Sequence, residues 1–253
     1  MLKKRVVPVL LLADGRMVKG RQFKEYRDTG DPKSAARIYN AQYADELVFI
    51  DIQAGLKNRG ALLDIVRIAA SECFMPLTVG GGITHIDDVR ALLLAGADKV
   101  IITTAAVLQP ALIRQAAEIF GSQCVVAGID FRVQAGNAKV WIKCGTEATN
   151  LDPISHARNL VELGAGEILL NSIDRDGMMM GYDLDMASRA ADAVSVPVII
   201  CGGAGNFMHL AEAFQKTSVA AAACASLFHF GDNNPIRARS YLRNLGIPVR
   251  GVK

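Results

Sequence analysis

The stretch "PLTVGGGI", residues 76–83, decides the fold, because a similar stretch, "PVIICGGAG", recurs at residues 197–205. In both, a proline leads into a short run of apolar or β-branched residues, and glycines follow at once. Such a run is typical of a buried strand in a parallel sheet. Glycine directly after the strand allows backbone N–H groups to approach a ligand closely.

The similarity extends outward from these two stretches. "ELVFIDI" (46–52) matches "EILLNSI" (167–173) at an offset of 121, and "RVVPVLLL" (5–12) matches "CVVAGIDF" (124–131) at 119. "KVIITTAA" likewise matches "VAAAACAS". Four consecutive strand–helix units therefore occur twice. This repeat predicts two homologous half-barrels, roughly residues 1–121 and 122–253, related by an approximate two-fold axis.

Apolar runs alternate with segments of helical period along the whole chain. Strands are expected at 5–12, 47–52, 76–79, 98–102, 123–130, 166–173, 197–201 and 219–223. Helices are expected at 34–43, 61–73, 86–95, 105–119, 153–163, 184–193 and 207–215. Eight such units predict an α/β fold, a single (β/α)8 TIM barrel spanning residues 1–253. A doubly wound open sheet is the alternative.

Composition excludes several classes of function. A net charge of +3 is too small to indicate a nucleic-acid or membrane-surface partner. The five cysteines are odd in number and lack CxxC spacing, which predicts reduced thiols in a cytoplasmic protein. No run reaches the ~20 apolar residues of a membrane span. The basic start and short apolar run of "MLKKRVVPVLLLADG" favour a first strand over a signal peptide, since Pro8 interrupts the run.

Glycines follow two strands at symmetric positions, and hydroxyl residues follow the neighbouring strands. Backbone N–H groups in such loops, and the helix starts after them, favour anions. Two loops of this kind predict a substrate with a phosphate at each end, lying across the C-terminal mouth of the barrel; tight turns alone are the alternative. The expected phosphate-binding residues are Gly81, Gly82, Thr103, Thr104, Gly202, Gly203, Gly205 and Ser226.

Asp130 ends the apolar run of the fifth strand, between the two glycine loops in strand order. An unpaired buried charge is costly, so this acid needs a function or a partner. Burial also raises the pKa of a carboxyl group toward neutral pH, and we therefore predict that Asp130 is the general acid/base. A helix cap, or an ion pair with Lys19 or Arg175, is the alternative. Supporting roles at the mouth are expected for Lys19, Asp51, Ser172 and Asp176.

Motifs along nearly the whole chain resemble those of HisF, the cyclase subunit of imidazole glycerol phosphate synthase. They are "GRMVKG", "DELVFIDI", "VGGGI", "GADKV", "FGSQ", "GEILLNSIDRDG", "GYD", "CGGAG" and "SLFHF". The resemblance implies a (β/α)8 barrel that binds a bis-phosphate substrate and closes an imidazole ring. It also implies a glutaminase partner of the HisH type, which docks at the N-terminal face and supplies ammonia. No metal or redox cofactor is implied.

The resemblance extends to an ammonia gate at the N-terminal end of the barrel. Arg5, Glu46, Lys99 and Glu167 stand at or near the starts of strands and match the gate residues of that family. A salt-bridge network that only stabilises the barrel is the alternative. Arg5 and Leu11 are six residues apart, so ammonia that enters at the gate would cross ~20 Å of strand to reach the mouth. Asp98 and Gln123 match positions that face the glutaminase.

One catalytic position departs from the family pattern. HisF proteins use an aspartate at the end of the first strand and another at the end of the fifth; Asp130 matches the second, but Leu11 occupies the first. Asp14 cannot substitute, because an odd shift along a strand reverses the face. Val9 and Thr103 replace a cysteine and an asparagine usual in the family.

Leu11 leaves several interpretations of function open. The chain is either a HisF that tolerates Leu11 or a HisF-like paralogue that passes ammonia to another acceptor. "VPVLLL", "ECFMP" and "RIYN" resemble HisF-like proteins encoded with bacterial surface-polysaccharide genes, which act with a glutaminase and a separate amidotransferase to place an amidine on a nucleotide-linked sugar. A non-catalytic subunit that delivers ammonia overlaps this reading. A HisA-type isomerase fits less well, because it too needs an acid from each half.

Overall fold

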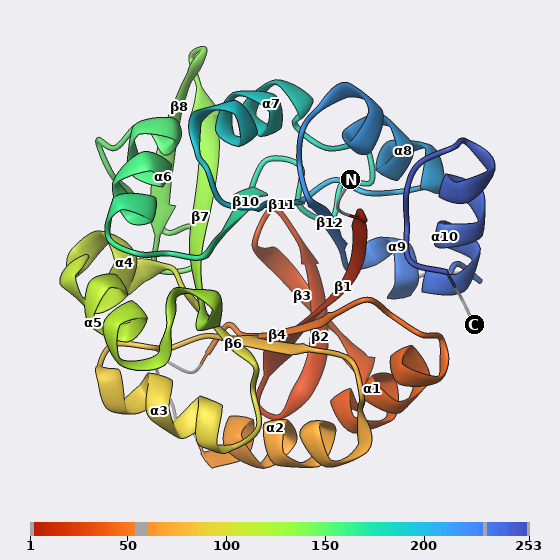
Figure 1. Ribbon diagram of the computed structural model, residues 1–253, viewed down its shortest axis with the longest axis horizontal. Helices are drawn as coiled ribbons and strands as arrows, with labels where there is room; N and C mark the ends of the chain where they lie inside the picture. Colours follow the sequence, from red (N-terminus) through yellow and green to blue (C-terminus); the bar gives the residue numbers. More distant parts are fainter. Residues whose placement is uncertain (1–2, 54–59, 230–231, 252–253) are drawn as a thin grey trace.

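In the computed structural model, which describes residues 3–53, 60–229 and 232–251, eight parallel strands close into a barrel (Figure 1). They are β1 (Arg5–Ala13), β4 (Leu47–Asp51), β5 (Leu77–Gly80), β6 (Lys99–Ile102), β7 (Val125–Gln134), β10 (Glu167–Ser172), β11 (Val198–Cys201) and β12 (Ala221–Cys224). The first strand, β1, pairs in parallel with both β4 and β12, and β7 pairs with β10. This closure confirms the (β/α)8 barrel and excludes the open sheet.

Helices surround the barrel in Figure 1. They are α1 (Pro32–Ala41), α2 (Gly60–Glu72), α3 (Ile86–Leu94), α4 (Thr104–Leu108), α5 (Ala111–Phe120), α6 (Pro153–Glu162), α7 (Leu184–Ala193), α8 (Phe207–Lys216), α9 (Ser226–His229) and α10 (Pro235–Asn244), with a 3-10 turn, η1 (Ser122–Cys124). The single helix expected at 105–119 is wrong: α4 and α5 divide at Gln109–Pro110, because proline cannot donate the helical hydrogen bond. None of the described helices is long and apolar enough to cross a membrane.

Two antiparallel extensions beyond the barrel strands were not expected from the sequence. The strands β2 (Arg16–Arg21) and β3 (Lys24–Gly30) extend β1, and β8 (Asn137–Ile142) and β9 (Glu147–Ala148) extend β7. The strand β3 is mostly polar and exposed, and a lysine interrupts the apolar residues of both β2 and β8, so these strands lack the longer apolar run that marks a barrel strand. Matching extensions on the first and fifth barrel strands agree with the predicted half-barrel repeat, which itself stays a prediction.

Alternate residues of each barrel strand point into and out of the barrel. The inward residues form a separate apolar cluster: Val7, Val9, Val48, Ile101, Val126, Leu169, Ile199, Ala221 and Ala223, each at most 4% exposed. The outward residues pack against the helices in the larger outer core. The barrel interior is therefore a packed apolar layer, with the polar side chains of the inward face confined to its two ends.

Candidate functional site

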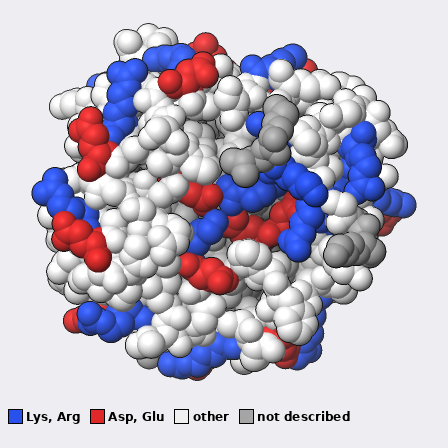
Figure 2. Space-filling view, in the orientation of Figure 1, with Lys and Arg blue, Asp and Glu red and all other residues white. Residues whose placement is uncertain are grey.

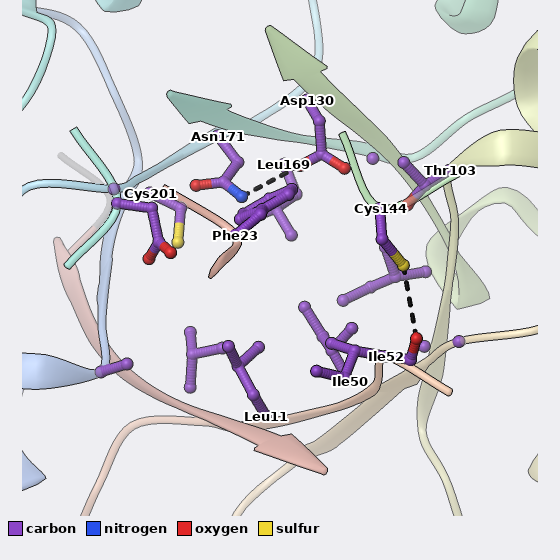
Figure 3. A pocket seen from close by; sticks show the side chains of 18 of the residues that line it. Leu11, Phe23, Ile50, Ile52, Thr103, Asp130, Cys144, Leu169, Asn171 and Cys201 are labelled. Carbon is purple, nitrogen blue, oxygen red and sulfur yellow. Dashed lines mark hydrogen bonds between the residues drawn. The ribbon is translucent and has the colours of Figure 1, made fainter. Parts of the chain in front are cut away.

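A pocket of about 660 Å³ lies at the carboxyl ends of the barrel strands. It is framed by the loops after the strands and by residues of the two antiparallel extensions, among them Phe23, Tyr26 and Cys144. Figure 3 shows this pocket, which we call the mouth pocket, with side chains converging on it from many strands. Several of the residues predicted at separate strand ends therefore share one cavity.

Asp130 lines this pocket and is held by a neighbouring strand. Asn171 Nδ2, on β10, donates to Asp130 Oδ1 at 2.9 Å. Burial raises the pKa of the Asp130 carboxyl from 3.8 to about 7; the hydrogen bond from Asn171 lowers it, and the charge of Asp176 adds to the rise. A carboxyl group with this pKa can take or give a proton near neutral pH. Among the described residues, Asp130 forms no ion pair with Lys19 or Arg175, because Lys19 pairs with Asp176 and Arg175 with Asp183.

Leu11 stands on the opposite wall of the pocket from Asp130. Figure 3 shows Leu11, Ile50 and Ile52 on one side, with Asp130 and Asn171 on the other. Leu11 lies between Val18 of β2 and Ile50 of β4 in the sheet, so its position is fixed on both sides. The wall facing Asp130 is thus apolar and offers no side-chain proton donor or acceptor at the Leu11 position.

The charged side chains predicted to support Asp130 reach the pocket. Lys19, on β2, is buried there, and its Nζ lies 2.6 Å from Asp176 Oδ1, in the loop after β10. Asp51, at the end of β4, also lines the pocket, and its Oδ1 accepts from the backbone N–H of Gln53 at 2.8 Å. Asp174, in the same loop as Asp176, instead accepts from the backbone N–H of Val133 at 2.8 Å, which is a structural role.

The structure does not bring Ser172 to the pocket. Its side chain is buried outside the pocket lining, while the adjacent Asn171 lines the pocket. Strand alternation explains the exchange, because Asn171 shares the inward face with Leu169. Counting in steps of two from Glu167 would have identified Asn171 in the sequence.

Both glycine loops face the pocket. Gly81 and Gly203 have φ of +113° and +115°, and a Cβ at either would lie 2.1 Å from a backbone oxygen, so only glycine fits. Of the predicted phosphate-binding residues, Gly81, Gly82, Thr103, Thr104, Gly202, Gly203 and Ser226 line the pocket. Gly205 does not, because its N–H donates to His209 Nδ1 at 3.1 Å.

Side chains cap the starts of the long helices that follow these loops. Asp88 of α3 accepts from the backbone N–H groups of Thr84 and His85, and Asn206 caps α8 through His209 N. The pocket lining includes both glycine loops and the hydroxyl residues Thr104 and Ser226, which begin α4 and α9.

We expect two phosphate ions to bind in the mouth pocket, one by Gly82 and Thr104 and the other by Gly203 and Ser226. Crystals grown in phosphate should show both anions, since each loop offers backbone donors. Thr104→Val should weaken only the first site and Ser226→Ala only the second, so each variant is the control for the other. Two empty loops at high phosphate would contradict a bis-phosphate ligand.

At the opposite end of the barrel, four charged side chains form a closed ring, here called the charged ring. Arg5 lies 2.7 Å from Glu46 and 2.7 Å from Glu167, and Lys99 lies 3.1 Å and 2.8 Å from the same two carboxylates. Thr78 Oγ1 also donates to Glu46 at 2.6 Å. Figure 2 shows charges of both signs gathered around the barrel axis on one face. Two positive and two negative charges make the ring neutral.

The surface beside the charged ring contains large exposed apolar side chains. Phe74 precedes β5 and is 95% exposed, and Leu94, near the end of α3, is 81% exposed. Asp98 and Gln123 are also exposed on this side, just before β6 and β7, and Asp98 Oδ2 accepts from Leu77 N at 2.7 Å. Phe74 and Leu94 are the two most exposed large apolar side chains among the described residues.

Comparison with protein families agrees with this geometry. A family model described as histidine biosynthesis protein matches residues 5–234. The match covers every barrel strand, both glycine loops and the four residues of the charged ring.

Proposed function

The chain belongs to the histidine biosynthesis protein family, whose members are isomerases and cyclases, and we propose that it is a HisF-type subunit that uses ammonia from a HisH-type glutaminase. In this proposal, ammonia enters at the charged ring, crosses the apolar barrel interior and meets a phosphorylated substrate in the mouth pocket. Asp130 then exchanges protons with the reacting groups, and the glycine loops hold the phosphates.

The observation that carries this proposal is the alignment of the charged ring, the apolar interior and the mouth pocket along one barrel. Inward residues of β10 illustrate it: Glu167 belongs to the ring, Leu169 to the apolar layer and Asn171 to the pocket. Ammonia is small and neutral, so an apolar interior admits it while opposing charged species, which are costly to desolvate.

The alternatives within the family differ in what they require of the mouth. A HisA-type isomerase relies on an acid from each half-barrel, whereas Leu11 occupies the place of the first acid, and the charged ring has no part in that reaction. Leu11 also favours a second candidate function: a paralogue that delivers ammonia for amidine formation on a nucleotide-linked sugar, with a separate amidotransferase as a further partner. Both ammonia-using functions require the same route through the barrel.

The glutaminase is proposed to dock beside the charged ring. Phe74 and Leu94 supply exposed apolar contacts there, and Asp98 and Gln123 supply polar ones. Aromatic and aliphatic side chains of this kind form the buried centre of protein interfaces, with polar residues around them.

Reversing one charge of the ring tests the proposed function. Lys99→Glu places a third carboxylate beside Glu46 and Glu167, so the ring should open or distort through repulsion. Glutamine-dependent product formation with the glutaminase should fall by ~5–150-fold relative to ammonium-dependent formation, the range of ordinary coupling energies. The measurement is the ratio of the two rates.

The control is Arg67→Glu, a charge reversal at an exposed helical ion pair with Asp64, which should leave that ratio unchanged. An unchanged ratio in Lys99→Glu would show that the ring does not conduct ammonia and only stabilises the barrel.

A further inference from the structure

Asn171 is a mouth-pocket residue with hydrogen-bonding capacity that proton transfer by Asp130 does not use. Its Nδ2 donates to Asp130, but its Oδ1 is buried and accepts no hydrogen bond from the described residues. A buried acceptor without a donor destabilises the structure, and a ligand that supplies the donor removes that cost on binding. Asn171 lines the pocket, so its Oδ1 is an acceptor without a hydrogen-bond donor in the described part of the pocket wall.

The glycine loop after β11 packs closely beside that oxygen. Gly202, on the neighbouring glycine loop, has φ of +87°, and a Cβ there would lie 3.0 Å from Asn171 Oδ1. A side chain at this position would crowd the oxygen, so this close packing requires glycine. Directly below Asn171 on the same inward face of β10, Leu169 belongs to the apolar layer that separates the pocket from the charged ring.

We infer that Asn171 and Asp130 together form the receiving site for ammonia or the ammonium ion, where the barrel interior opens into the mouth pocket. Asn171 Oδ1 accepts one N–H of the ligand and the Asp130 carboxylate accepts another. Leu11, across the pocket, can accept none. This inference rests on the proposed function and names the residues that bind its nitrogen source.

The charges around the pair favour a small donor over an anion. The lysines that line the pocket in the described residues have carboxylate partners: Lys19 with Asp176, and Lys143 with Glu147 at 2.7 Å. Asp51 adds a further carboxyl group to the lining. Tyr26 and the thiols of Cys144 and Cys201 have raised pKa values, chiefly through burial, and so remain neutral near pH 7.

The test follows the titration of Asp130 by carboxyl-carbon NMR, with Asp130→Asn used to assign the signal. Ammonium chloride should shift the wild-type titration to lower pH, because a bound cation favours the carboxylate. Tetramethylammonium chloride at equal ionic strength has the same charge but no N–H donor and should not shift it. In Asn171→Leu, which has similar volume and no acceptor, the ammonium concentration needed for half of the shift should rise about two- to tenfold.

An equal shift with tetramethylammonium, or an ammonium shift that is unchanged in Asn171→Leu, would overturn the inference. Asn171→Ser, which keeps a shorter polar group, replaces the leucine variant if that variant does not fold. In turnover assays, the KM for ammonium should rise in Asn171→Leu while the KM for the phosphorylated substrate stays the same. The NMR result stands without turnover, so failure of the proposed function alone would leave an Asn171-dependent ammonium shift intact.

Discussion

Replacing Leu11 with aspartate is expected to raise ammonium-dependent cyclisation of the histidine-pathway substrate by ~10²–10⁴-fold, the usual contribution of a general acid or base. Leu11 lines the pocket opposite Asp130, so an aspartate there would face the substrate from the first half-barrel, as the family pattern requires. The effect is large because a leucine can neither transfer a proton nor accept a hydrogen bond.

The new carboxylate would have apolar neighbours. Ile50 pairs with Leu11 in the sheet, and Val9 lies two residues before it on the same inward face. Such surroundings should raise the pKa of an aspartate at position 11 and cost some stability, since burial penalises the charged form. A lower melting temperature together with a faster reaction is therefore the expected result.

The comparison uses wild type, Leu11→Asp and Leu11→Asn, with free ammonium in place of a glutaminase. The asparagine variant is the matched control, because it has the same shape without the titratable proton. No gain in Leu11→Asp would indicate that the pocket has diverged further and would favour another ammonia acceptor. Rapid turnover by the wild type would show that one carboxylate suffices and would remove the argument for a paralogue.

Asp130→Asn is expected to reduce ammonium-dependent cyclisation by ~10²–10⁴-fold at neutral pH, because it removes the proposed general acid/base of the pocket. The asparagine Oδ1 can still accept from Asn171 Nδ2, so the local geometry should persist. In the wild type, a base with a pKa of about 7 predicts kcat/KM that rises with pH through that value. A rate that is independent of pH, or a fully active variant, would assign the chemistry elsewhere.

The same substitution should stabilise the protein at high pH. The Asp130 carboxyl keeps its proton up to about pH 7 in the folded chain, against 3.8 for an ordinary aspartate. Between these values the folded state binds more protons than the unfolded state, so the free energy of unfolding falls as pH rises. Asp130→Asn removes the titrating group and so abolishes this pH-dependent loss of stability. Because Asp130 is partly exposed to water, the loss in wild type is smaller than the full ~1.4 kcal/mol per unit of pKa shift.

Thermal melts of wild type and variant check this sign. The variant should melt a few degrees higher than wild type at about pH 8, at ~2–4 °C per kcal/mol for a chain of this size, with little difference at about pH 4. A variant that is less stable at high pH would mean that the charged carboxylate stabilises the fold.

The sequence alone predicted the barrel, most of the pocket and the members of the charged ring. These predictions succeed because they depend on strand ends, which are local in sequence. In a parallel barrel all carboxyl ends meet at one mouth and all amino ends at the other, so Asp130 and the glycines after β5 and β11 had to converge. Arg5, Glu46, Lys99 and Glu167 had to meet at the other end for the same reason.

Only the tertiary structure decided which side chain at each strand end enters the pocket. Asn171 rather than Ser172 faces inward, Gly205 is turned toward His209, and Lys19 meets Asp176 across 157 residues of chain. The strand β3, which belongs to the first antiparallel extension, also lies outside any apolar pattern. These features depend on register between strands that are distant in sequence, and a shift of one residue would reverse every face. Closure of the barrel sets that register, through hydrogen bonds that no single segment of the sequence contains.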